Sequence, residues 1–143
     1  MVKYSVKKLD RRNKEVEVYC DMGNVEIDRG VKMIQVRLDG EELSSLTFDY
    51  GIRVSTIFDI RSNVLRRGYA TMLLSALIDI VKIHNLEIKN SIVLTPNLKD
   101  LCIIKSIQGS IIPVDAIIEY DELYRFYEKQ GFIKDKRLLK LIE

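Results

Sequence analysis

The first 60 residues alternate between apolar and polar positions, which predicts strands with one buried face. The alternating apolar positions are Val2, Tyr4 and Val6, then Val16, Val18 and Cys20, then Ile34, Val36 and Leu38, then Leu46 and Phe48, and finally Ile52, Val54, Thr56, Phe58 and Ile60. Asp39-Gly40 separates two of these runs and supplies the positive φ angles that a tight hairpin turn requires. We therefore predict a meander of antiparallel strands, with no helix before residue 65.

The spacing changes after residue 65, where apolar positions recur with a helical period. They form one stripe, which consists of Ala70, Leu73, Leu74, Leu77 and Val81. We predict that this helix ends near Asn85, because asparagine is common just beyond helix ends. His84 is then expected on the surface, where the negative end of the helix dipole favours it.

The segment after the helix holds a β-branched run and weaker signals. Residues 91–95 (SIVLT) predict a strand buried on both faces, and the proline directly after it is expected to end it. Residues 101–107 fit either a strand or a short helix. The helical period returns at Asp121, with Gly131 expected just after that helix. Residues 132–142 predict one or two closing strands.

Length and composition indicate one compact domain spanning residues 1–143. Hydrophobic residues make up 47% of the chain and the net charge is +2, a balance that does not indicate nucleic-acid binding. Cys20 and Cys102 form no metal-binding spacing with His84, so we expect reduced thiols and no metal site. The chain shows neither a signal-peptide core nor an apolar run of the roughly 18 residues that span a bilayer. We therefore expect a cytoplasmic protein without a membrane partner.

Residues 57–74 (IFDIRSNVLRRGYATMLL) carry the first chemical signal. A predicted strand leads into a loop that opens directly into the predicted helix, whose first N–H groups lack internal partners and carry partial positive charge. Gly68 permits close approach to the backbone, and Ala70 keeps the first turn small. Arg66 and Arg67 add positive charge. Such a loop can hold a phosphate or pyrophosphate, although a tight turn with two solvated arginines fits the same residues.

A second block, residues 124–132 (YRFYEKQGF), follows farther along the chain. Together the two blocks resemble the conserved blocks of the GNAT superfamily of acyl-CoA N-acyltransferases. The first block of that family has the form Arg/Gln-x-x-Gly-x-Gly/Ala, which Gly68 and Ala70 match. The second ends in a Tyr-Glu-Lys-x-Gly-Phe-like run, which residues 127–132 match. The order of elements also agrees, and the similarity covers about residues 30–143.

The resemblance implies an α/β (α+β) GNAT fold, with a mixed, mostly antiparallel central sheet on which a cofactor helix and a second helix pack. It implies acetyl-CoA as co-substrate and a small-molecule or protein amine as acceptor. The strand at residues 58–60 would pair through its backbone with the pantetheine arm of the cofactor. The implied cofactor-binding residues are Phe58, Asp59, Ile60, Leu65, Arg66, Arg67, Gly68, Tyr69, Ala70, Thr71, Asn97 and Tyr127.

The implied reaction is attack of a neutral amine on the thioester, after which CoA leaves as a thiolate. By resemblance, Tyr127 is the candidate general acid for the thiolate, although it also fits a core aromatic position. Asp59 and Glu119 are the candidate general bases, and Asp121 fits a helix cap better than a base. Asn97 is expected to touch the cofactor because it follows the predicted core strand.

The sequence also departs from the family pattern. Leu65 stands where the family usually has Arg or Gln, so Arg66 or Arg67 would supply the charge. The segment at 98–119 is long and is expected to shape the acceptor pocket or an interface. The two N-terminal helices that often wall the acceptor site are not visible, so that site must be built differently.

Three further possibilities remain at this stage. The chain can be a non-catalytic GNAT-fold module that binds CoA or a protein partner. More remotely, it can be a nucleotide-binding regulatory domain. Exposed strand edges also allow a homodimer.

Overall fold

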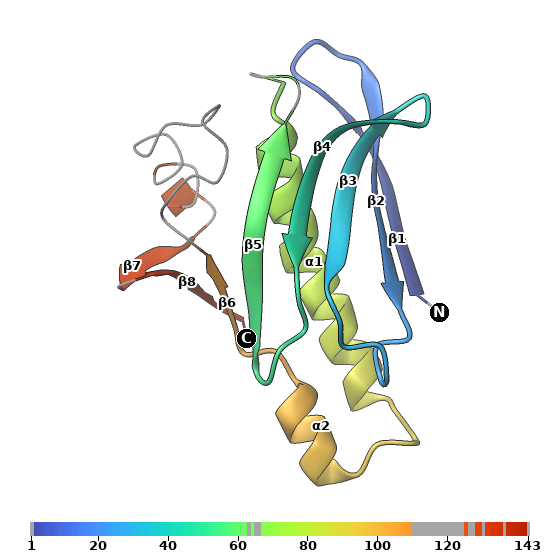
Figure 1. Ribbon diagram of the computed structural model, residues 1–143, viewed down its shortest axis with the longest axis vertical. Helices are drawn as coiled ribbons and strands as arrows, with labels where there is room; N and C mark the ends of the chain where they lie inside the picture. The colour runs from blue at the N-terminus through green and yellow to red at the C-terminus, as the bar shows by residue number, and fades with distance from the viewer. Residues whose placement is uncertain are drawn as a thin grey trace.

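The computed structural model describes residues 2–62, 64, 67–109, 125, 128–129, 131–135 and 137–142. All eight strands in this part of the chain belong to one sheet, in the order β1-β2-β3-β4-β5-β6-β8-β7, and α1 lies along one face of it (Figure 1). Only the β5–β6 pair is parallel. The predicted fold class, a mixed and mostly antiparallel sheet with helices, is confirmed. Neither helix in the described part is long and apolar enough to cross a membrane.

Five strands form the meander that the alternation predicted. They are β1 (Val2–Leu9), β2 (Glu15–Gly23), β3 (Lys32–Leu38), β4 (Glu41–Phe48) and β5 (Val54–Ser62). Asp39 and Gly40 have φ angles of 51° and 80° and turn β3 into β4, as expected. Within residues 2–62 no helix precedes β5, so the meander itself occupies the N-terminal part of the chain.

The helix α1 (Tyr69–Lys89) supplies the other half of the core. Its buried residues are Tyr69, Leu73, Leu74, Ala76, Leu77, Ile80, Val81, His84, Asn85 and Ile88. The predicted stripe is confirmed, but the predicted end at Asn85 is wrong. Asn85 is buried, and its side-chain amide bonds both backbone groups of Ile104, each at 2.8 Å. The helix therefore extends past Asn85 to Lys89. Its 21 residues span about 30 Å at 1.5 Å per residue.

A β-bulge interrupts the pairing of β4 with β5. Phe48 pairs with Ile57, whereas Thr47 pairs with Asp59, so Phe58 is an extra residue in β5. The bulge changes which alternate positions face α1: Ile57 and Ile60 are both buried, but Phe58 is 48% exposed. The prediction that Ile60 shares one face of the sheet with the alternate positions before the bulge, back to Ile52, is therefore wrong.

Residues 91–95 do not form the core strand that their β-branched side chains predicted. Ile92 and Val93 are 98% and 73% exposed. Thr95 instead caps a second helix, α2 (Pro96–Cys102), by accepting from the Leu98 N–H at 3.3 Å. The strand beside β5 is β6 (Ser106–Gly109), so the ambiguous segment at 101–107 contains both a helix end and a strand start.

The closing strands form a hairpin at the far edge of the sheet. β7 (Ile133–Asp135) pairs with β8 (Arg137–Leu141), and β8 pairs with β6. Gly131 has a φ of 88° and follows the helical residues Glu128 and Lys129, which confirms its predicted place. Most of the helix predicted from Asp121 lies outside the described residues.

Candidate cofactor site

The start of α1 has no side-chain cap among the described residues. Gly68 precedes the first turn with φ 82° and ψ 11°, a left-handed conformation that glycine adopts without steric cost. Glycine has no side chain that could cap the helix, and the first turn holds no acidic residue. The partial positive charge of the helix dipole is therefore not neutralised by α1 itself.

The turn between β1 and β2 docks on this helix start. The Tyr69 hydroxyl donates to Asp10 Oδ2 at 2.8 Å, and the Arg11 N–H donates to the Arg67 carbonyl at 3.1 Å. Arg67 Nη1 lies 4.0 Å from the same oxygen of Asp10. These contacts join residues nearly 60 positions apart in sequence and hold the turn against the loop before α1.

Asp10 is buried and ionised at the centre of this contact. Its Oδ1 accepts from the N–H groups of Arg12 at 2.8 Å and Lys14 at 3.0 Å. Hydrogen bonds from the Lys14 N–H and from Tyr69 hold the pKa of Asp10 below its usual range. Burial, together with the hydrogen bond to Asp10, raises the pKa of Tyr69. The charge of this carboxylate is thus directed inward, to the turn and to α1.

The basic side chains of the same turn lie on the outside. Arg11, Arg12 and Lys14 are exposed. The Arg11 side chain lies beside Gly68, with its Nε 3.4 Å from the position that a Cβ on that glycine would occupy. The sequence analysis did not assign these residues to the site, although the run DRRNK between two alternating segments is a recognisable basic turn.

On the side of β5 away from β4, the described pairing with β6 covers Val54 to Ile57, opposite Ser106 to Gly109. Within the described residues no strand lies along 58–62 on that side, and residues 110–124, which follow β6, lie outside the described part. Asp59 Oδ2 accepts from Arg61 at 3.1 Å. The other carboxylate oxygen, Oδ1, is buried and has no hydrogen-bond partner in the described part of the chain.

Apart from Asn97, the predicted site residues fall into three groups. Phe58, Asp59 and Ile60 lie in β5, where no described strand pairs with them on the side away from β4, and 67–71 form the loop end and the first turn of α1. Tyr69 directs its side chain inward to Asp10, so only its backbone is available there. The predicted residues outside the described part are Leu65, Arg66, Glu119 and Tyr127.

Asn97 does not follow a core strand, which was the reason for assigning it to the cofactor. It lies in α2, which contacts the C-terminal end of α1 through the bond from Lys99 Nζ to the Lys89 carbonyl at 3.0 Å. Figure 1 shows α2 at the opposite end of α1 from the β1–β2 turn. The assignment of Asn97 is therefore corrected, because the length of α1 separates it from Gly68.

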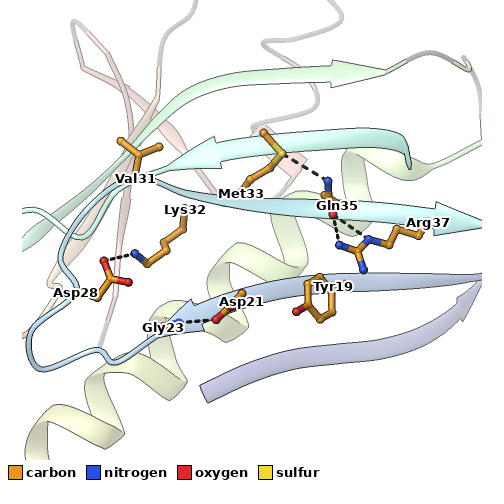
Figure 2. Close-up of a pocket in the computed structure, with 9 residues that line it drawn as sticks. All are labelled: Tyr19, Asp21, Gly23, Asp28, Val31, Lys32, Met33, Gln35 and Arg37. Carbon is orange, nitrogen blue, oxygen red and sulfur yellow. Dashed lines mark hydrogen bonds and ion pairs between the residues drawn. The ribbon is translucent and has the colours of Figure 1, made fainter. Parts of the chain in front are cut away.

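The sheet face opposite α1 carries a hollow of about 490 Å³ over β2 and β3 (Figure 2). The Arg37 guanidinium lies over the Tyr19 ring at 4.1 Å, and Lys32 reaches Asp28 at 2.6 Å. Met33, on the wall of the hollow, is in register with Thr47, which is in register with Asp59. Two strand spacings, about 10 Å, therefore separate the hollow from Asp59. None of the predicted site residues that the structure describes lines this hollow.

The far end of α1 holds a buried polar cluster instead of a surface histidine. His84 is fully buried and stacks on Tyr50, with ring centroids 4.4 Å apart. The Nε2 atom of His84 accepts a hydrogen bond from the Arg29 guanidinium at 2.6 Å. Because a guanidinium can only donate, the His84 proton lies on Nδ1, 3.1 Å from Asn85 Oδ1. Burial, with the nearby Arg29 charge, lowers the pKa of His84 to about 4. The predicted surface position of His84 is wrong.

Comparisons with known proteins agree with this architecture. No family model and no curated protein matches the sequence. The crystal structure of the GNAT domain of S. lividans PAT superposes with a TM-score of 0.58 over 96% of this chain and 97% of that domain, at 8% sequence identity. At such low identity the likeness concerns the fold. The chain has the GNAT fold.

Proposed function

We propose that the protein is an acyl-CoA N-acyltransferase that moves an acetyl group from acetyl-CoA to a primary amine. The observation that carries the proposal is the junction of β5 with α1. A bulged strand, with no described strand beside residues 58–62 on one side, precedes a helix that begins after a left-handed glycine and has no side-chain cap among the described residues. This junction offers a run of backbone groups followed by a site for phosphate.

The described residues fit acetyl-CoA at this junction. The uncapped N–H groups of the first turn of α1, next to Gly68, would hold the pyrophosphate, with Arg67 nearby. Residues 58–60, beside which no described strand lies on one side, would pair with the amides of the pantetheine arm, as an added strand pairs with a sheet edge. Bound acetyl-CoA supplies the activated acetyl group.

The chain must also handle protons during transfer. A lysine-like amine has a pKa near 10.4 and must lose a proton before its nitrogen attacks the carbonyl carbon. The Oδ1 of Asp59, which has no hydrogen-bond partner among the described residues, supports that residue as the base, and Glu119 remains a second candidate. As the N–C bond forms and the C–S bond breaks, Tyr127 is proposed to give its proton to the departing thiolate.

We propose that the body of the acceptor amine lies on the sheet face opposite α1. The hollow on β2 and β3 opens on the same face as Asp59, and no helix in the described part covers it. Its walls combine the aromatic Tyr19 and the exposed Met33 with the acidic Asp21. This lining suits an amine that carries an apolar body, in a small molecule or in a protein side chain.

The test is release of free thiol from acetyl-CoA with a panel of small amines and lysine-containing peptides. Asp59→Asn should lower turnover by about a hundredfold, the usual contribution of a general base, with unchanged affinity for acetyl-CoA. Asp39→Asn is the matched control, because asparagine tolerates its left-handed turn conformation. Tight CoA binding without thiol release from any amine would favour the non-catalytic module.

A further inference from the structure

The tip of the β1–β2 hairpin concentrates positive charge. Residues 7–14 (KKLDRRNK) contain five basic residues and a single acidic one, whereas the whole chain has a net charge of +2. Lys7 lies 3.5 Å from Glu15, but Arg11, Arg12 and Lys14 form no ion pair within the described residues. The tip therefore presents uncompensated charge to solvent.

The acidic residue in this tip does not neutralise its neighbours on the outside. Asp10 is turned inward, where it accepts from two turn N–H groups and from Tyr69. Its hydrogen bonds also fix the turn, in which Asn13 adopts a left-handed φ of 60°. The exposed arginines are therefore presented from a rigid backbone, which lowers the entropy lost on binding.

The positive charge of the hairpin tip lies next to the start of α1. The Arg11 N–H is bonded to the Arg67 carbonyl, and the Arg11 side chain lies beside Gly68, at the positive end of α1. The ionised Asp10 at this end pairs with Arg67, and no ion pair in the described part compensates Arg11. The fold holds the Arg11 side chain beside a helix start, and an anionic ligand would relieve their repulsion.

We propose that Arg11 and Arg12 bind the 3′-phosphate of CoA. The inference rests on the proposed function, in which the pyrophosphate occupies the first turn of α1. The 3′-phosphate is the remaining anionic group of the cofactor, and it is attached to the ribose next to the pyrophosphate. A guanidinium offers paired N–H donors that match phosphate oxygens.

Calorimetric titration with CoA and with 3′-dephospho-CoA tests the proposal. The unmodified protein should bind CoA about tenfold more tightly, the effect expected of one charge-assisted hydrogen bond. The double variant Arg11→Gln, Arg12→Gln should lose this preference and keep its affinity for 3′-dephospho-CoA. The matched control Lys82→Gln, Lys89→Gln removes the same charge from exposed positions along α1 and should keep the preference.

The outcomes separate this inference from the proposed function. Equal affinity of the unmodified protein for both ligands, or a preserved preference in the double variant, overturns the phosphate assignment and leaves acetyl-CoA binding standing. Absence of binding by either ligand overturns both. If the double variant does not fold, Arg12→Gln alone serves, because Arg12 is exposed, and a preference unchanged from the unmodified protein would count against the inference.

Discussion

The two ends of α1 treat polar groups in opposite ways. At the C-terminal end, His84 and Asn85 are buried, and Arg29 and Ile104 satisfy their hydrogen bonds. At the N-terminal end, the N–H groups have no side-chain cap among the described residues, and Arg11 and Arg12 are exposed. Asp10 and Tyr69 are buried there, and the hydrogen bond between them serves to place the hairpin tip.

The difference separates groups that hold the fold from groups that we propose bind a ligand. A buried network contributes stability because each donor meets an acceptor inside the protein. An exposed cluster of like charges contributes little or negative stability, and its value lies in attracting an anion. Variants at the two ends should therefore affect different measurements.

The largest effect is expected from Asn85→Ala. The substitution leaves the N–H and carbonyl of Ile104 and the Nδ1–H of His84 without partners in the core. The free energy of unfolding should fall by about 4 kcal/mol, since each orphaned group costs about 1–3 kcal/mol. Urea denaturation measures the loss. Asn90→Ala, an exposed position at the end of the same helix, should change it by less than about 0.5 kcal/mol.

The second effect is a dependence of stability on pH that comes from His84. Its folded pKa of about 4 lies below the unfolded value of about 6.5, so the unfolded chain binds more protons between these values. Stability from this group is full above about pH 6.5 and falls by about 3 kcal/mol as the pH drops to about 4. Denaturation at several pH values should show a smaller slope in His84→Gln. An unchanged slope would contradict a buried neutral histidine.

Gly68→Ala should have a smaller effect on stability and a clear effect on binding. A left-handed alanine costs about 1–2 kcal/mol, and its Cβ would contact Arg11 beside the helix start. Gly40→Ala is the matched control, because its φ is also about 80° but no atom lies within 4 Å of the added carbon. Both variants should lose similar stability, and only Gly68→Ala should weaken CoA binding in calorimetry.

The smallest effect on stability is expected from Arg11→Gln with Arg12→Gln in the absence of ligand. These side chains form no ion pair in the described part of the chain, so the free energy of unfolding should change by no more than about 0.5 kcal/mol. Low salt should favour the variant slightly, because repulsion near Gly68 is reduced. A marked loss of stability would show that the arginines at the N-terminal end of α1 stabilise the fold, as the buried polar cluster at the C-terminal end does.

Much of the fold could be predicted because its signals are local. Alternation defines the meander, and Asp39-Gly40 specifies a hairpin that needs no distant contact. The strand predicted at 91–95 was wrong because β-branched side chains favour a strand only where a neighbouring strand is available. His84 was misplaced although it continues the stripe that includes Val81, three residues before it.

The candidate site was predicted in part for the same reason. The loop before α1 and residues 58–60 of β5 are close in sequence, so one stretch of residues indicates both. The docking of Asp10 on Tyr69 joins segments 59 residues apart, and no local pattern indicates that contact. The bulge at Phe58 was missed because Ile57 and Phe58 are both apolar, so either one fits the buried position of an alternating strand.

The bulge has a consequence for how such a site arises during evolution. Ile57 and Asp59 pair with adjacent residues of β4, so removing Phe58 would leave regular pairing along the whole strand. Substitutions at this position alter a side chain, whereas gain or loss of a single codon decides whether the strand is irregular at all. Among distant relatives that share this architecture, insertions and deletions in this strand would therefore be more informative than residue identity.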